Sequence, residues 1–344
     1  MKVYKEKSLK QYNSFGVNVK AKHLIICESV KDIISLDSKS IFKEKFFILG
    51  GGSNTLFTKD FDGTIIKMDI KGKNIIKEDK DTVLLKINAG EDWTNIVKWS
   101  VENNLLGIQN LALIPGTCGA APVQNIGAYG SEIKDNLVDV EIYDIKTKKI
   151  KIITNTNCMF GYRDSIFKNK LKNKMVITGI TLKLQKINPK NNVPDKYTQY
   201  GDIKKLLEER YHNKATLINL YKTICEIRKN KLPDIKEYGS CGSTFQNPII
   251  DINIYEILKQ KFPEIPTYDC GIKGKVKIPA AYILEKIGWK NKKIGNVGTW
   301  TYHPLIVTNY GNATGKDILE VIDKIRNDFY KETGIKLDTE INII

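Results

Sequence analysis

The stretch from Ile114 to Gly130 constrains the fold more than any other part of the chain. Its seventeen residues include four glycines, two prolines and three alanines, and none of them is charged. An ordinary solvated loop would be polar, so we expect this backbone to pack against a large, flat, partly polar ligand. Gln124 and Asn125 would supply hydrogen-bonding groups to that ligand.

A second glycine turn points the same way. Gly50, Gly51, Gly52, Ser53 and Asn54 follow a short apolar run of strand length at 46–49. Glycines let backbone N–H groups approach an anion closely, although a tight turn between strands is an equal alternative for this motif alone. Thr55 stands where the Rossmann fingerprint needs its third small residue, so that motif is excluded. Two loops without lysine favour phosphates held by backbone amides, as in a dinucleotide such as FAD.

Length and composition predict a compact protein without a membrane segment. The chain has 344 residues, of which 41% are hydrophobic and 27% charged, as in ordinary folded chains. No apolar run of about 18 residues occurs, so we expect neither membrane insertion nor secretion. The six cysteines form no C-x-x-C pair, which favours reduced thiols, no metal site and a cytoplasmic location.

The net charge of +16 raises the possibility of a nucleic-acid partner. Only four of the 55 basic residues are arginine, and the lysines are spread along the whole chain. Nucleic-acid readers rely on the bidentate arginine fork. We therefore expect no nucleic-acid binding.

The hydrophobic pattern predicts a mixed fold of short strands and helices. Strands are expected at 23–27, 46–49, 64–69, 83–88, 138–145, 149–154, 175–184 and 336–344. Helices are expected at 93–103, 202–229 and 279–288, and from a capping box at Thr314 onward. The segment 185–200 is expected to be a loop and a domain boundary. Gly315 and Lys316 imitate a P-loop but have one residue too few before them, so they are expected to begin a helix.

Three further residues are candidates for chemistry. Arg163 lies in a turn, and a retained arginine in a lysine-rich chain suggests a carboxylate ligand; a salt bridge to Asp164 is an equal alternative. Ser243 stands in a turn of small residues and could donate a proton, but no histidine lies nearby in sequence to make it a nucleophile. Glu340 falls on the polar face of the final strand and matters only if that face meets a cleft.

Five motifs, in this order, resemble the UDP-N-acetylenolpyruvoylglucosamine reductase (UDP-N-acetylmuramate dehydrogenase) family. They are 49–54, 114–130, 161–165, 239–248 and 337–340. The resemblance implies an α+β fold, with an N-terminal FAD-binding domain of the vanillyl-alcohol-oxidase type and a C-terminal α+β substrate-binding domain. It places the FAD-binding domain at 14–190, as two α+β subdomains split near residue 70, and the substrate-binding domain at 231–344. The intervening 191–230 resembles the loop insertion and connecting helices of the family's type I branch.

The resemblance also implies which residues act. Arg163 and Glu340 match the groups that stabilise developing negative charge, with Glu340 protonated or sharing a proton, and Ser243 matches the general acid. The implied cofactor-binding residues are Gly50, Gly51, Gly52, Ser53, Asn54, Pro115, Gly116, Gly119, Ala121, Asn125, Gly127, Ala128 and Tyr129. The implied substrate-binding residues are Tyr200, Lys231, Asn247 and His303, although a packed histidine is an equal interpretation of the last.

The implied reaction needs non-covalent FAD, NADPH as co-substrate and a UDP-sugar, and no metal; we expect a monomer. Two positions depart from the family pattern: Asn342 replaces a basic residue and Gln246 replaces a lysine, which puts details of substrate affinity in doubt. A sibling oxidase is the nearest alternative. In that case His23 or Cys118 could tether the flavin. A lysine-rich nucleic-acid-binding module is the third and weakest interpretation.

Overall fold

The computed structural model describes residues 1–344 and divides into two compact units. Unit 1 comprises Met1–Lys7, Ala21–Gly51 and Phe61–Asn230, and unit 2 comprises Ser8–Lys20, Gly52–Asp60 and Lys231–Ile344. The division passes through the first glycine turn, so Gly51 belongs to unit 1 and Gly52 to unit 2. No helix is both long enough and apolar enough to cross a membrane.

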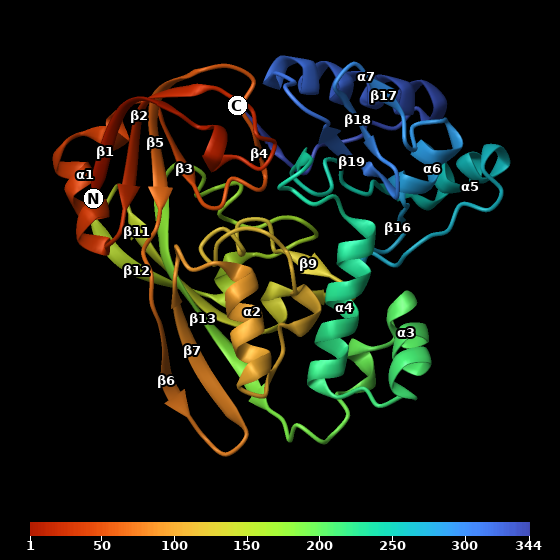
Figure 1. Cartoon of the computed structure of the whole chain (residues 1–344), viewed down its shortest axis with the longest axis horizontal. Coiled ribbons are helices and arrows are strands. Elements are labelled where there is room, and N and C mark those ends of the chain that lie inside the picture. The colour runs from red at the N-terminus through yellow and green to blue at the C-terminus, as the bar shows by residue number, and fades with distance from the viewer. The chain divides into compact units, whose positions relative to one another are not determined.

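The first sheet of unit 1 has four strands in the order β1-β2-β5-β3 (Figure 1). Their bounds are β1 Lys2–Ser8, β2 Lys20–Cys27, β5 Phe61–Met68 and β3 Phe46–Leu49. β5 pairs in parallel with both β2 and β3. Helix α1 (Val30–Ser38) begins at a capping box between Ser29 and Asp32. The first glycine turn follows the end of β3, where the buried Leu49 anchors it.

The second sheet of unit 1 is antiparallel and contributes residues from several of its strands to that unit's core. It runs in the order β12-β11-β13-β7-β6, and β8 also pairs with β13. The bounds are β12 Lys149–Thr154, β11 Leu137–Asp144, β13 Met175–Lys186, β7 Thr82–Asn88, β6 Lys73–Glu78 and β8 Leu105–Leu106. Helix α2 (Trp93–Glu102) begins at the cap Asp92 and buries Trp93, Ile96, Val97 and Val101 in the same core. The expected helix at 93–103 is therefore confirmed, as are the strands at 83–88 and 149–154.

The expected helix over 202–229 is wrong, because the structure has two helices there. They are α3 (Asp202–Tyr211) and α4 (Leu217–Lys231). His212 and Asn213 adopt positive φ angles of 47° and 63°, a left-handed conformation that ends a right-handed helix. The apolar period resumes after this break, which is why the sequence looked continuous.

Unit 2 is built on a second antiparallel sheet with helices packed against it. The sheet runs β14-β19-β18-β17, and two further strand pairs are β15 with β16 and β20 with β4. The strands are β14 Gly239–Ser240, β19 His303–Asn309, β18 Val297–Trp300, β17 Lys293–Ile294, β15 Ile249–Asp251, β16 Lys275–Lys277, β20 Asn342–Ile343 and β4 Thr55–Leu56. The helices are α5 Ile252–Lys261, α6 Ala280–Lys286 and α7 Gly315–Thr333. The helix start at Gly315 is confirmed, because Thr314 and Asp317 form the predicted capping box.

The expected final strand at 336–344 is largely wrong. Only Asn342–Ile343 forms a strand, parallel to β4, while Thr339 makes an isolated bridge with Phe245. The alternating pattern predicts one continuous strand, but this segment changes partner half-way. Leu337 and Ile341 are buried as expected, whereas Ile343 is exposed.

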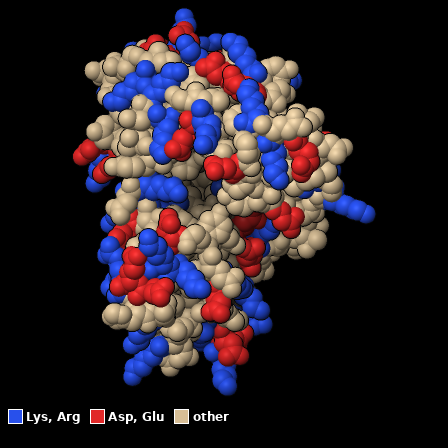
Figure 2. Space-filling view, turned by 90° about the vertical axis from the view of Figure 1, so that its right-hand side faces the viewer, with Lys and Arg blue, Asp and Glu red and all other residues tan.

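Charged side chains are interspersed over the surface. On the face drawn in Figure 2, lysine and arginine lie among aspartate, glutamate and uncharged residues. Several lysines form exposed ion pairs, such as Lys98 with Glu102 and Lys205 with Glu209, each four residues apart on a helix. This is the dispersed distribution of lysine that the sequence predicts. Such surface pairs contribute little to stability.

Candidate active site

Unit 1 brings its part of the first glycine turn against the second glycine-rich loop. A Cβ atom on Gly51 would lie 2.7 Å from the Cα of Gly116, and one on Gly50 would lie 2.7 Å from Oγ1 of Thr117. Only glycine allows two backbones to approach this closely. The two motifs singled out in the sequence are therefore parts of one structure.

The second loop is anchored to the chain just before α2. The backbone N–H groups of Trp93 and Cys118 donate to the carbonyls of Gly116 and Glu91, at 3.1 and 2.8 Å. Gly119 N–H donates to the Ala89 carbonyl at 2.9 Å. Because the loop is fixed by backbone bonds, its uncharged side chains are not needed to hold its shape. Cys118 is fully buried, and this burial holds the pKa of its thiol well above the ordinary value of 9.0.

Asn125 has a structural role that the sequence did not reveal. Its side chain is buried. The Nδ2 atom donates to Oε2 of Glu132 at 2.9 Å and to the Gly161 carbonyl at 3.0 Å. Its Oδ1 accepts from the backbone N–H of Lys134 at 3.3 Å. The amide is thus engaged within unit 1, so any contact of Asn125 with a cofactor would come from its backbone.

Arg163 lies in the expected turn, where Gly161 pairs with Asp164. Its φ angle is +52°, a strained conformation for a side-chain-bearing residue that is characteristic of functional sites. Its Nη2 donates to the Gly127 carbonyl at 2.9 Å, and its guanidinium lies 5.6 Å from the ring centre of Tyr162. The structure therefore joins Arg163 to the predicted cofactor-binding loop.

Arg228 is a site residue that sequence reasoning missed. Its Nη2 donates to the Leu113 carbonyl at 3.3 Å, directly before the loop, and its Nε is buried without a hydrogen-bond partner. Burial lowers the pKa of this guanidinium, as does the charge of Arg163, and a hydrogen bond with the Tyr129 hydroxyl opposes the shift. None of these neighbours is a carboxylate. The signal was available, because Arg228 is one of only four arginines.

Tyr129 and Tyr200 lie together at the far end of the same loop. Their ring centres are 6.0 Å apart in an edge-to-face arrangement. The Tyr129 carbonyl accepts a hydrogen bond from Nδ2 of Asn110 at 3.0 Å. Tyr200 is 51% exposed, so most of its ring is free of the core. A residue expected to contact substrate thus borders one expected to contact the cofactor.

Unit 2 places Glu340 next to the segment that carries Ser243. The backbone N–H of Glu340 donates to the Thr244 carbonyl at 2.7 Å. Two residues away, the N–H of Gln246 donates to the Asp338 carbonyl at 2.9 Å. Ser243 is partly buried and follows Gly242, whose φ angle of +68° sets the turn. The general-acid candidate and the carboxyl candidate are therefore near neighbours, although they lie far apart in sequence.

Asn54 and Asn342 extend this arrangement. Nδ2 of Asn54 donates to the Glu340 carbonyl at 3.3 Å, and the Asn54 carbonyl accepts from the backbone N–H of Asn342 at 3.0 Å. The Asn342 side chain donates to the same carbonyl at 3.2 Å. The departure at Asn342 thus has a structural use, because its amide ties the chain terminus to the glycine turn.

Two of the predicted substrate-binding residues of unit 2 occupy polar positions near chain turns. Oδ1 of Asn247 accepts from the N–H of Ala280 at 3.0 Å, at the start of α6, which leaves its NH₂ group as the part suited to a ligand. His303 begins β19, and burial together with the charge of Lys231 lowers the pKa of its imidazole to about 4. His303 is therefore neutral at neutral pH. Its Nδ1 accepts from the backbone N–H of Leu305 at 3.4 Å, which leaves the N–H at Nε2 as a donor.

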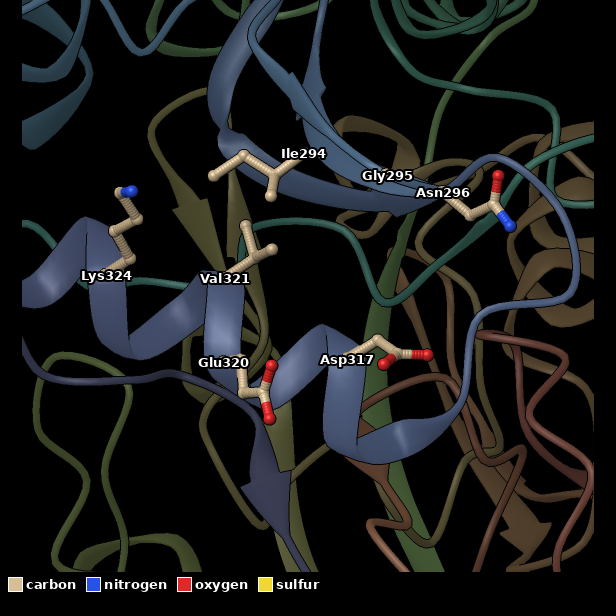
Figure 3. Close-up of a pocket in the computed structure, with 7 residues that line it drawn as sticks. All are labelled: Ile294, Gly295, Asn296, Asp317, Glu320, Val321 and Lys324. Carbon is tan, nitrogen blue, oxygen red and sulfur yellow. The ribbon is translucent and has the colours of Figure 1, made fainter.

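A separate hollow of about 460 Å³ lies between α7 and the turn from β17 to β18. Figure 3 shows its lining residues, which include Asp317, Glu320 and Lys324 of α7 and Asn296 of the turn. Asp317 already caps its own helix. None of the residues expected to act in catalysis lies in this hollow.

Comparison with known proteins covers almost the whole chain. A family model described as an FAD binding domain matches residues 21–151, and one described as the C-terminal domain of UDP-N-acetylenolpyruvoylglucosamine reductase matches 234–344. The reductase of Flavobacterium johnsoniae is 44% identical over 344 residues, which is all of both chains. The chain belongs to the UDP-N-acetylenolpyruvoylglucosamine reductase family.

Other members of this family are also similar to this chain over nearly its full length. The reductase of Pseudomonas aeruginosa is 35% identical over 337 residues, covering 98% of this chain and 97% of the relative. The crystal structure of the Thermus caldophilus reductase superimposes with a TM-score of 0.68 at 19% identity, covering 99% and 98% of the two chains. The expected α+β class with an FAD-binding domain is confirmed, and the chain is an FAD-dependent oxidoreductase of this reductase family.

The residues of unit 1 suit FAD, the family's cofactor. Gly51 lies against the backbone of Gly116, so no side chain separates the two loops at that point. Arg228, without a carboxylate neighbour, provides positive charge for an anionic, acceptor-rich ligand. When bound, FAD supplies the hydride transfer that no amino-acid side chain can perform.

We expect Gly51→Ala to lose FAD. The new Cβ would lie 2.7 Å from Gly116 Cα, so the two loops must separate. The measurement is the ratio of absorbance at 450 nm to that at 280 nm after purification, followed by FAD titration. Gly161→Ala is the control, because its Cβ would meet only ordinary contacts at 3.5 Å. Equal flavin content in both variants would contradict the assignment.

We expect the free energy of unfolding to fall in mild acid because of His303. Its pKa falls from 6.5 to about 4 on folding, so the unfolded chain binds more protons between these values and stability is lost as pH falls through 6.5. Between pH 7 and 5 this loss is about 2 kcal/mol. Urea unfolding at both pH values should show it in the wild type and in His212→Asn, an exposed-histidine control, but not in His303→Gln. The same pH dependence in all three proteins would refute the shift.

Proposed function

We propose that the protein uses NADPH to reduce UDP-N-acetylglucosamine enolpyruvate to UDP-N-acetylmuramate. The product is a precursor of peptidoglycan, and we place the reaction in the cytoplasm, where NADPH is available, with the chain acting as a monomer. One observation carries the proposal. Glu340 is bound through its backbone to Thr244, beside Ser243, in a chain that is 44% identical to a reductase over its full length.

Each segment of the chain has its own proposed binding function. We propose that residues 14–190 bind FAD non-covalently, that 191–230 carry the type I insertion, and that 231–344 bind the UDP-sugar. The proposed FAD contacts are the backbones of 50–54 and 115–129; within unit 1, Gly50 and Gly51 lie against Thr117 and Gly116. Covalent attachment through Cys118 is disfavoured, because this thiol is fully buried and its pKa lies well above 9.0; a reactive cysteine needs an exposed, low-pKa thiolate.

Each proposed catalytic residue has a separate task. Arg163 offers a fixed cationic fork to the carboxylate of the enolpyruvyl group. Its position is held by the Gly127 carbonyl. Glu340, in its protonated form, donates a hydrogen bond to the negative charge that develops beside that carboxylate. Ser243 donates the proton that the substrate carbon receives.

The proposed substrate contacts lie on both the nucleotide and sugar sides. Lys231 binds the diphosphate by charge, and Tyr200 closes over the substrate, which its exposed ring allows. Asn247 contributes its NH₂ group, since its oxygen is already bonded to Ala280. His303 stays neutral, because its pKa is about 4, and it donates a hydrogen bond from Nε2, since its Nδ1 already accepts from Leu305.

An anaerobic visible spectrum of the purified protein tests the whole proposal. NADPH should bleach the absorbance near 450 nm, and UDP-N-acetylglucosamine enolpyruvate should restore it. Bleaching without recovery would reject this substrate and favour a sibling flavoprotein. Denaturation in acid should release the flavin into the supernatant, whereas flavin retained by the precipitate would show a covalent bond.

We expect Ser243→Ala to slow only the second half of the reaction. Loss of the proton donor should reduce the rate of flavin reoxidation by substrate on the order of 10² to 10⁴-fold, while reduction by NADPH is unchanged. Stopped-flow absorbance measures the two halves separately. Ser240→Ala, three residues earlier in β14, is the control and should keep both rates. Slowing of both halves in Ser243→Ala would refute its role as the acid.

A further inference from the structure

One member of an aromatic cluster contacts the residue proposed to bind the diphosphate. The cluster consists of Tyr238, Trp300, Tyr302 and Tyr310, all in unit 2. The ring centre of Trp300 lies 5.4 Å from that of Tyr238 and 6.1 Å from that of Tyr302, and Tyr238 lies 5.7 Å from Tyr310. Nothing in the proposed chemistry requires these four rings.

Tyr310, at one end of the cluster, makes two contacts outside it. The hydroxyl of Tyr310 donates to the Thr299 carbonyl at 3.2 Å, and the ammonium of Lys293 lies 3.8 Å from the centre of the Tyr310 ring. A cation at this distance over an aromatic face is attracted by the ring quadrupole. A hydrogen bond and a cation–π contact therefore hold Tyr310, whereas Tyr302 is exposed.

Trp300 connects this cluster to Lys231. Its indole Nε1 donates a hydrogen bond to the Lys231 carbonyl at 3.1 Å. Lys231 is the last residue of α4, and a carbonyl at a helix end has no donor within its own helix. The indole N–H thus satisfies an oxygen that would otherwise depend on water, and it holds the backbone from which the lysine side chain extends.

The pKa of His303 depends on the position of the Lys231 ammonium, because burial and the lysine charge together lower it. Trp300 and His303 face each other in the pairing of β18 with β19. The charge of Lys231 reaches the imidazole of His303, because it contributes to the lowered pKa of that group. One short hairpin therefore presents both the group that fixes the lysine backbone and a neighbour of the lysine charge.

We propose that Trp300 is a positioning residue for the nucleotide diphosphate: its indole N–H fixes the Lys231 backbone so that the ammonium meets the diphosphate beside His303. The inference rests on the proposed role of Lys231. A lysine side chain has four flexible bonds and much entropy to lose. Because a large ring packed between other rings has few orientations, anchoring the backbone through it reduces the ordering that substrate binding must complete.

Steady-state kinetics of three variants tests the inference. Trp300→Phe keeps the ring and removes the N–H; we expect KM for the UDP-sugar to rise about 3- to 10-fold, the effect of one hydrogen bond. The kcat value and the rate of flavin reduction by NADPH should not change. Tyr310→Phe is the matched control, because it also loses one hydroxyl-to-carbonyl bond of the cluster but none to Lys231; its KM should equal that of the wild type.

A second readout follows the position of the lysine directly. The chain has three histidines, so the His303 signal is identified in an NMR titration by its loss in His303→Gln. Lys231→Met should raise the pKa of His303 by removing the nearby charge, and Trp300→Phe should raise it by a smaller amount. Tyr310→Phe should leave it unchanged. Added UDP should raise it in the wild type, since the diphosphate offsets the lysine charge.

Three results would overturn the inference. A wild-type KM and an unshifted His303 titration in Trp300→Phe would show that the indole N–H does not position Lys231. Equal increases of KM in Trp300→Phe and Tyr310→Phe would show that the cluster is merely structural. A wild-type KM in Lys231→Met would remove the role of Lys231 and this inference with it, whereas recovery of the flavin spectrum by substrate would still support the proposed reaction.

Discussion

The contact between two glycine backbones is the constraint on which unit 1 depends. Gly51 and Gly116 lie so close that a single Cβ atom would collide. This approach requires the first turn to leave β3 at the right place, and it requires the second loop to be bound to the chain before α2, as Trp93, Cys118 and Gly119 bind it. The strands and helix of unit 1 fix the position of both loops. Glycine-rich loops can bind the phosphates of a cofactor through their backbone N–H groups, without any lysine.

Unit 2 depends on a chain terminus that changes partners. Thr339 pairs with Phe245, and Asn342 pairs with Thr55. Between these two contacts lies Glu340, whose backbone is fixed at both its N–H and its carbonyl. A single regular strand would place this residue in a continuous ladder. The change of partner instead holds the carboxyl candidate beside the segment of Ser243 while joining it to the first glycine turn.

Each unit holds a basic side chain whose pKa is lowered by burial and by a neighbouring positive charge. Arg228 is buried beside Arg163 with a tyrosine hydroxyl as its hydrogen-bond partner, and His303 stays neutral near Lys231. A buried cation without a carboxylate partner is costly, so stability alone does not explain Arg228. Such arrangements are typical of sites that bind anions. They agree with a reaction in which both the nucleotide diphosphate and the carboxylate of the substrate are negative.

The hydrophobic period of the sequence was enough to predict a mixture of strands and helices and the position of most of them, and the absence of charge at 114–130 marked the second glycine motif. The α+β class with an FAD-binding domain came from the resemblance of five motifs to a family. The sequence also indicated Arg163, Ser243 and Glu340 as candidates through motifs that lie far apart. It did not reveal the break between α3 and α4, where two residues with positive φ interrupt a period that continues on either side. Nor did it reveal the roles of Asn125, Arg228 and Trp300. Their hydrogen bonds join residues distant in sequence, and only tertiary structure decides which buried donor meets which carbonyl.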